Sequence, residues 1–161
     1  MEPLPLPEEI TDLVEIRHGF EVGEHRFLIL KETFSELTTR TEICAIPDAP
    51  RSFLGFINHR GETVPVFSIQ RLLEPDTDAV GRWILLIDQG SKTVGILLDS
   101  YPRGLSEIED ANNASPVEDK IVAQFCGDAF QHQGELWREF DHHRFCEYAK
   151  REFSAPRLNS G

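Results

Sequence analysis

The C-terminal part of the chain holds a group of side chains whose chemistry suits a metal ion. His142, His143 and Cys146 stand close together, and imidazole nitrogen and thiolate sulfur are ligands that zinc prefers. A structural zinc site needs four ligands, and no fourth ligand is evident near these three. Solvated histidines on a terminal helix are the commoner explanation. The sequence therefore predicts no metal site and no cofactor.

A second group, Gly90-Ser91-Lys92-Thr93, has the composition of a phosphate-binding loop. Such a loop needs an earlier glycine at a fixed spacing and a helix that begins directly after it. Here the following residues, TVGILLD, are typical of a strand, so we predict a hairpin turn. Signature motifs of serine hydrolases, zinc proteases and dithiol enzymes do not occur in the sequence, and we expect no enzymatic activity.

A third group lies in the stretch GFINHRGETVPVFS, residues 55–68. Apolar residues alternate on both sides of Asn58-His59-Arg60-Gly61, which predicts a hairpin with these four residues at its tip. Backbone physics alone explains the tip: Asn58 starts a turn, Gly61 accepts a positive φ, and His59 and Arg60 are exposed. An arginine on a tight turn can also bind a carboxylate through two hydrogen bonds. The residues leave both roles for Arg60 open.

Composition favours a soluble globular protein whose partners are proteins. The 161 residues are 40% apolar, enough for one buried core, and contain no apolar run long enough to span a membrane. A net charge of −12 repels phosphate backbones, so we expect no nucleic-acid partner. Three widely spaced cysteines indicate reduced thiols in a cytoplasm. We expect a cytoplasmic protein without direct membrane insertion.

Hairpins account for most of the expected secondary structure. Apolar segments flank four turns, at Gly23-Glu24, at Asn58 to Gly61, at the QGSK segment and at Gly134. The segment FSELTTRTEICAIPDAP predicts a short helical or irregular connection followed by an extended stretch. Several short strands in hairpins, without long alternating helices, favour an all-β fold of small barrels over an α/β fold.

Two short helices complete the expected elements. Ile69, Leu72 and Leu73 have helical spacing, with Ser68 as the N-cap residue and Pro75 ending the helix. A terminal helix opens at Asp141 and places apolar residues on one face, namely Phe145, Ala149 and Phe153.

The tip hairpin and two further segments resemble the CheW-like family. The middle strands of that family read G-x-x-N-x-R-G followed by a P-V strand, which is matched here by Gly55, Asn58, Arg60, Gly61, Pro65 and Val66. Upstream, FSEL is similar to the family's V-x-E-I, and downstream TVGILLDSY, with Gly95 and Asp99, is similar to V-G-x-x-V-D-x-V. Three segments in the same order are far more specific than one. The resemblance extends from about Phe20 to Phe140.

The resemblance implies an all-β fold of two small five-stranded SH3-like β-barrels, packed around a shared apolar core, with short helices that include a C-terminal one. We expect a single CheW-like domain over residues 13–153 and flexible tails at 1–12 and 154–161. The implied function is a non-catalytic adaptor that couples chemoreceptors (methyl-accepting chemotaxis proteins) to a CheA-type histidine kinase. Its partners would be the chemoreceptor signalling tip and the regulatory domain of the kinase, at membrane-associated receptor arrays.

Two alternatives stay open within this reading. The pathway is either chemotaxis or type IV pilus twitching motility, and the segment around Trp137 looks more like the pilus adaptors. A β-barrel interaction module with a different partner is the alternative function.

The resemblance also implies where partners bind. A helical receptor hairpin needs a groove with apolar walls and one or two fixed charges, and Glu36 and Arg60 suit that role. The candidate partner-binding residues are Phe34, Glu36, Leu37, Gly55, Asn58, His59, Arg60 and Gly61. The candidate structural residues of the motif are Pro65, Val66, Gly95 and Asp99. Ser68-Ile69-Gln70 stands where the family usually has D-L-R.

Overall fold

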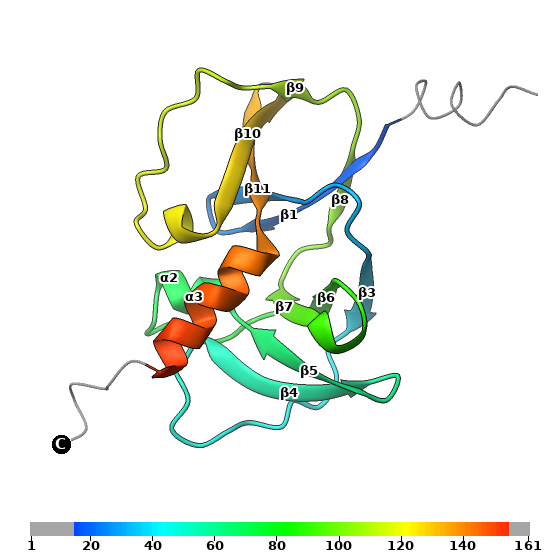
Figure 1. Ribbon diagram of the computed structural model, residues 1–161, viewed down its shortest axis with the longest axis vertical. Coiled ribbons are helices and arrows are strands. Elements are labelled where there is room, and N and C mark those ends of the chain that lie inside the picture. The colour runs from blue at the N-terminus through cyan, green and yellow to red at the C-terminus, as the bar shows by residue number, and fades with distance from the viewer. Residues whose placement is uncertain (1–14, 155–161) are drawn as a thin grey trace, which may run out of the picture.

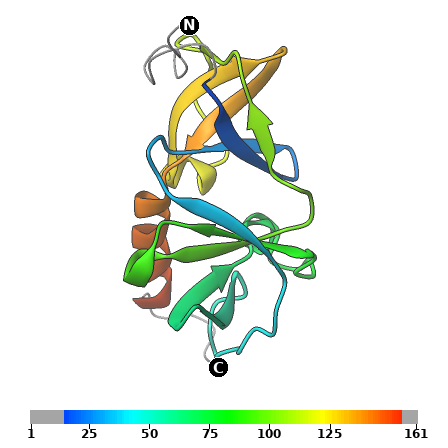
Figure 2. The ribbon, with the colours of Figure 1, turned by 90° about the vertical axis from the view of Figure 1, so that its right-hand side faces the viewer.

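The computed structural model describes residues 15–154, whose strands form two sheets, one above the other (Figure 1, Figure 2). Among these residues the first sheet has the strand order β8-β1-β2-β11-β10-β9, and the second has the order β3-β6-β7-β5-β4. The prediction of an all-β fold of two small β units with a C-terminal helix is confirmed, but among the described residues the first unit has six strands rather than the five expected.

The first sheet combines the two ends of the described chain. Its strands are β1 (Arg17–Val22), β2 (His25–Ile29), β8 (Arg103–Leu105), β9 (Glu109–Asp110), β10 (Cys126–His132) and β11 (Glu135–Phe140). The predicted hairpins at Gly23 and Gly134 are confirmed, and both glycines have a positive φ. β11 runs parallel to β2, which joins the N-terminal hairpin to the C-terminal one. The short strands β8 and β9 were not expected, and they extend the sheet at its two edges.

The second sheet contains the motif hairpin. Its strands are β3 (Ser35–Thr39), β4 (Phe53–His59), β5 (Glu62–Phe67), β6 (Trp83–Ile87) and β7 (Val94–Leu98). The QGSK segment is a hairpin turn as predicted and includes the short 3₁₀ helix η1 (Gly90–Lys92). The expectation of a helical or irregular connection after Phe34 was wrong for β3. This segment is a strand because it pairs along its whole length with the buried strand β6.

The described helices are α2 (Ile69–Leu73), α3 (His142–Ser154) and the 3₁₀ turn η2 (Val122–Gln124), besides η1. Ser68 caps α2 as predicted, because its Oγ accepts a hydrogen bond from the Arg71 N–H at 3.1 Å. Asp141 likewise accepts a hydrogen bond from the Arg144 N–H at 3.1 Å. Ser154 is the last residue of α3, so it does not belong to the expected tail. The tails at 1–12 and 155–161 lie outside the described residues.

The main core lies between the two sheets and is closed on one side by α3 (Figure 1). Phe145 of α3 is 1% exposed. Its ring centre lies 5.2 Å from that of Phe140 in the first sheet and 5.2 Å from that of Phe67 in the second. Smaller apolar clusters cover the other face of each sheet. The helix therefore ties the two β units together by burial of aromatic side chains.

A buried ion pair fixes the interior of the first sheet. Arg17 in β1 is 7% exposed, and its Nη2 donates hydrogen bonds to the Ile29 carbonyl and to Glu139 Oε2, at 3.0 and 3.1 Å. The same guanidinium lies over the Phe130 ring at 5.2 Å. A buried charge needs such a set of partners. This ion pair links β1 to β11 across β2, which lies between them in the sheet.

Candidate functional site

The motif hairpin turns at two residues rather than four. β4 continues to His59, and Arg60 and Gly61 form the turn with φ values of +51° and +83°. Two successive positive φ values are typical of the tightest hairpins. Asn58 supports the turn, because its Oδ1 accepts a hydrogen bond from the Gly61 N–H at 3.2 Å. The positive φ predicted for Gly61 is confirmed, and the prediction that Asn58 and His59 belong to the turn itself was wrong.

Glu36 holds both residues at the end of this hairpin. Its Oε1 lies 2.9 Å from His59 Nε2, and its Oε2 lies 3.1 Å from Arg60 Nη2. Glu36 comes from β3 and His59 from β4, which are the two edge strands of the second sheet. The sheet therefore curls until its edges meet at this carboxylate, as expected for a small barrel.

Four of the predicted partner-binding residues lie together around one hollow of about 200 Å³. These are Phe34, Glu36, His59 and Arg60, and the turn after β6 forms the opposite wall. Phe34 is 52% exposed, which is unusual for a phenylalanine, and the Arg60 side chain is 73% exposed. The hollow thus combines an accessible aromatic ring with a guanidinium whose direction is set by Glu36.

The other predicted partner-binding residues have positions that suit packing. Leu37 is half-buried against the main core. Gly55 is buried with a φ of +132°, and a Cβ atom there would overlap the carbonyl group of Cys44. Cys44 pairs with Phe56 through two backbone hydrogen bonds at 2.8 and 3.0 Å. Glycine at position 55 therefore lets the chain around Cys44 lie directly on β4.

The four predicted structural residues lie in or directly after the central strands. Val66 is fully buried and pairs with Gly95 of the parallel strand β7, and Pro65 pairs with Phe56. A Cβ atom at Gly95 would lie 3.0 Å from a methyl group of Ile84. Asp99 follows the end of β7 and is exposed. Close packing explains the glycine and the valine, but the structure gives Asp99 no packing role.

Ser68-Ile69-Gln70, which stands in place of the usual D-L-R, forms the start of α2. Ser68 is the N-cap residue, Ile69 is fully buried, and Gln70 is exposed. Serine and aspartate are both good N-cap residues. The departure from the family pattern therefore preserves the helix cap but removes two charges, an acid at the cap and a base at the exposed position of Gln70.

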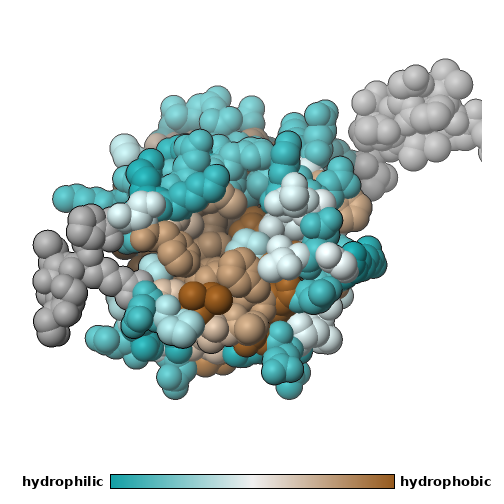
Figure 3. Space-filling model, turned by 60° about the horizontal axis from the view of Figure 1, so that its bottom comes forward, coloured by the Kyte–Doolittle hydropathy of each residue, from teal (hydrophilic) through white to brown (hydrophobic). Residues whose placement is uncertain are grey.

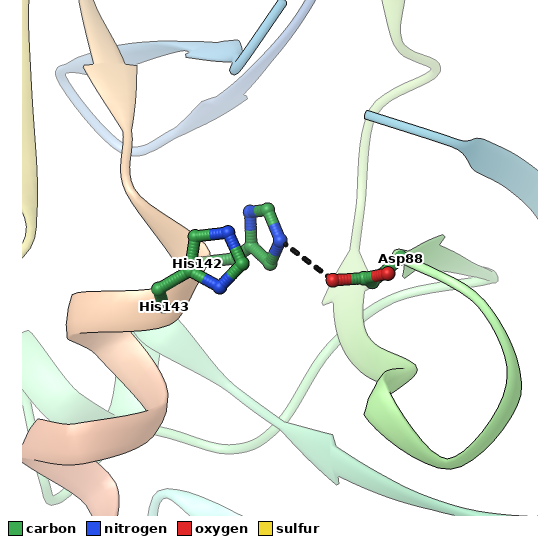
Figure 4. Close-up of side chains that lie close together, drawn as sticks. All are labelled: Asp88, His142 and His143. Carbon is green, nitrogen blue, oxygen red and sulfur yellow. Dashed lines mark hydrogen bonds and ion pairs between the residues drawn. The ribbon is translucent and has the colours of Figure 1, made fainter. Parts of the chain in front are cut away.

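The histidines at the start of α3 are not both solvated. His143 is exposed, but His142 is 2% exposed, and its Nε2 lies 3.1 Å from Asp88 Oδ2 (Figure 4). Burial lowers the pKa of His142 despite its hydrogen bond to Asp88. Burial also acts to raise the pKa of Asp88, but hydrogen bonds from the Gln89 N–H and from His142 hold it below the ordinary value. The pair is therefore a neutral imidazole that donates to a carboxylate at neutral pH.

A second hollow, with apolar walls, lies at the start of β4, at the opposite end of this strand from the Arg60–Gly61 turn. Figure 3 shows apolar residues gathered in the middle of one face and ringed by hydrophilic ones. A shallow hollow between β4, α2 and α3 is lined by Phe53, Leu72 and Phe153, among others. Phe153 is 47% exposed, although its ring contacts that of Phe53 with centres 5.0 Å apart. The sequence predicted that Phe153 packs on the domain, and this contact confirms it in part.

The CheW-like domain matches residues 18–149 of this chain. This range includes both sheets and much of α3. The chain therefore belongs to the family of CheW-like domains, which the three sequence segments predicted. Members of this family serve as non-catalytic adaptors in chemotaxis, so the prediction that this protein is not an enzyme is confirmed.

Individual relatives agree with this assignment. The chain is 27% identical over 110 residues to a probable chemotaxis protein CheW of Rhizobium etli, an alignment that covers 66% of this chain and 71% of that protein. The scaffolding protein TtCheW from Thermoanaerobacter tengcongensis has the same fold, with a TM-score of 0.59 and 16% identity, over 79% of this chain and 88% of that one.

One further match is of a different kind. A stretch of 140 residues is 28% identical to part of the human copper-containing amine oxidase 2, which covers 86% of this chain but only 18% of the oxidase. So small a share of the oxidase does not bring its activity to this chain.

Among residues 15–154, neither α2 nor α3 has the length and apolar content needed to cross a membrane.

Proposed function

We propose that this protein is a coupling adaptor that binds the signalling tip of a chemoreceptor and the regulatory domain of a CheA-type histidine kinase. It acts in the cytoplasm, at membrane-associated receptor arrays. Membership of the CheW-like family supports the adaptor role. The hollow between Phe34 and Arg60 is the observation that carries the choice of surface.

The hollow suits a helical partner that presents one apolar and one acidic side chain. An apolar side chain can pack on Phe34, which is half-exposed in the free protein. Arg60 has more N–H donors than the single contact to Glu36 uses, so it can also bind a carboxylate of the partner. Because Glu36 and the tight turn already orient the guanidinium, little side-chain entropy remains to be lost on binding.

The expected energy of this contact depends on how far the partner covers Arg60. Loss of an arginine contact costs about 1 to 3 kcal/mol where the pair is desolvated, and below about 1 kcal/mol at an exposed rim. Phe34 lies beside the pair and provides the apolar cover that removes water. We therefore expect loss of the Arg60 contact to cost about 1 to 3 kcal/mol of binding free energy.

We propose that the protein acts in one of two pathways, chemotaxis or type IV pilus twitching motility. The resemblance to pilus adaptors involves Trp137, which is fully buried with Leu28 and Leu105 in the first sheet. This residue therefore serves packing and offers no surface that a pilus-system partner would contact. The named relative from Rhizobium etli favours chemotaxis.

A different partner is the second candidate, and the apolar face in Figure 3 favours it. None of the predicted partner-binding residues lines the hollow between α2 and α3. A module that bound its partner there would tolerate changes at the motif hairpin.

Binding measured by titration calorimetry distinguishes the two candidates. The ligands are a soluble chemoreceptor signalling tip and the kinase regulatory domain, each titrated with wild type, Arg60→Glu and Lys120→Glu. Lys120 is an exposed cation before η2, in the other β unit. We expect Arg60→Glu to lose at least about tenfold in affinity for one ligand and Lys120→Glu to match wild type. Wild-type affinity for both ligands in Arg60→Glu would contradict the proposed surface.

A further inference from the structure

We propose that Asp88, His142 and His143 form a binding site for a divalent transition metal ion of the zinc type. Among residues 15–154 these three side chains form a group whose potential ligand atoms all lie within 4.8 Å of one another. Asp88 follows β6, and the two histidines begin α3 (Figure 4). The sequence could not pair them because 54 positions separate Asp88 from His142.

The distances within the group suit two ligands on one ion. Asp88 Oδ2 and His142 Nε2 are 3.1 Å apart. Ligands about 2.0 to 2.1 Å from a tetrahedral zinc ion are separated by about 3.3 Å, so the ion can take the place of the shared proton with a small movement. The rings of His142 and His143 are also close, with centres 4.0 Å apart. His143 can therefore provide a third ligand.

Asp88 is held in position for this role. Its Oδ1 accepts a hydrogen bond from the Gln89 N–H at 2.8 Å, which leaves Oδ2 directed toward His142. Its backbone has a φ of +75°, a conformation that few residues other than glycine adopt. Supporting hydrogen bonds of this kind orient carboxylate ligands in metal sites.

Binding of an ion at His142 Nε2 requires the ring proton to lie on Nδ1. The His142 ring is buried, and its Nδ1 has no hydrogen-bond partner among the described residues. In the free protein the ring proton is on Nε2, where it faces Asp88. When the ion binds, the proton moves to Nδ1 and leaves the Nε2 lone pair for the ion, at the cost of a buried N–H that has no acceptor among the described residues.

The chemistry of the group selects the class of metal. Two imidazole nitrogens and one carboxylate oxygen suit zinc and its neighbours, whereas calcium and magnesium prefer oxygen ligands alone. His143 is exposed, so the ion can enter from solvent and water can complete its coordination. Cys146, which the sequence suggested as a ligand, does not belong to the group.

An ion bound at this site would connect two separate parts of the fold. Asp88 also lines the hollow that contains Glu36 and Arg60, while His142 belongs to the helix that closes the core. An ion bound here would hold the turn after β6 to the start of α3. Metal binding is independent of the adaptor function and can be measured without any partner.

The test is titration of the metal-free protein with Zn²⁺ alone, followed by calorimetry and by thermal unfolding. We expect one ion per chain and a rise in melting temperature. His143→Ala changes only an exposed side chain, so the fold is retained, and the affinity for Zn²⁺ falls at least about tenfold. Asp88→Asn removes the carboxylate ligand and should also lower the affinity for Zn²⁺.

His18→Ala is the matched control, since it removes another exposed histidine, from β1. It should bind Zn²⁺ as wild type does. Absence of a one-to-one complex, or equal affinity in wild type and His143→Ala, would show that Asp88 and His142 form only a structural hydrogen bond. Titration with Co²⁺ excludes the cysteines: a thiolate-to-cobalt charge-transfer band would place the ion on sulfur and overturn the proposal.

Discussion

Glu36 Oε2 lies 3.1 Å from Arg60 Nη2, so the arginine that the sequence places at a hairpin tip is anchored to the opposite edge of its own sheet. The same carboxylate contacts His59 through its other oxygen. The arginine is therefore both accessible and oriented, which are the two properties that a contact residue needs.

Loss of the Arg60 side chain should barely affect folding. The side chain is 73% exposed, and exposed ion pairs contribute less than about 1 kcal/mol. We expect Arg60→Ala to change the free energy of unfolding by less than this amount. Glu36→Ala should cost more, because it removes the acceptor shared by His59 and Arg60. Urea unfolding of both variants provides the comparison, and a larger loss for Arg60→Ala would show that the turn depends on its side chain.

The two motif glycines should differ in how much stability the protein loses when alanine replaces them. Gly61 has a positive φ and open space around it, so Gly61→Ala should cost about 1 kcal/mol through the backbone alone. Gly55→Ala adds an overlap with the Cys44 carbonyl group and should cost about 3 kcal/mol. Thermal unfolding of the two variants measures the difference. Equal melting temperatures would mean that the chain around Cys44 does not lie directly on β4.

The terminal helix should be necessary for stability. Phe145 is fully enclosed by aromatic rings from both sheets, and removal of such a ring costs about 3 to 5 kcal/mol. Truncation after Asp141 should therefore unfold or aggregate the protein, and Phe145→Ala should lower its melting temperature strongly. Phe153→Ala is the control, since that residue is 47% exposed. A stable, soluble truncated chain would show that α3 is a detachable appendage.

Stability should fall in mild acid because of His142. Burial holds the pKa of this histidine below its ordinary value in the folded state, so between the unfolded value of about 6.5 and the lower folded value only the unfolded chain takes up the proton. The free energy of unfolding therefore has its full value above about pH 6.5. It decreases as the pH falls below that value, by at most about 1.4 kcal/mol per pH unit. The groups that face the imidazole are Asp88, Asp141 and His143.

This dependence is measured as the difference between wild type and His142→Gln in urea unfolding from pH 7.5 to 5. The variant should lose part of the decline seen in wild type, whereas His18→Ala, which changes an exposed residue, should keep it. Parallel curves for wild type and His142→Gln would mean that the imidazole is protonated as easily in the folded protein as in the unfolded chain.

Local signals explain which elements the sequence predicted. Hairpins with a glycine in the turn, such as the one at Gly134, need only neighbouring residues to form, and so does the Ser68 cap of α2. β3 was missed because its partner β6 is distant in the sequence. The parallel pairing of β11 with β2 and the buried contact between Arg17 and Glu139 leave no local pattern either.

The same reasoning applies to the candidate site. The motif indicated Arg60 and the FSEL segment indicated Glu36, but their mutual contact depends on how the sheet curls. Gly55 and Leu37 belong to the same sequence segments, and in the structure they serve packing. A motif therefore predicted which segments matter without separating contact residues from those that position them.

The adaptor account is tested most directly by exchanging the two charges of the Glu36–Arg60 pair. Arg60→Glu alone places two carboxylates together, whereas Glu36→Arg with Arg60→Glu restores an ion pair of opposite orientation. Affinity for the chemoreceptor signalling tip and for the kinase regulatory domain is measured for wild type, the single variant and the double variant. We expect the double variant to be more stable than Arg60→Glu alone, short of wild type because His59 loses its contact with Glu36, while its affinity for one partner stays at least about tenfold lower. Full recovery of binding in the double variant would contradict the account, because it would show that the pair only supports the hairpin.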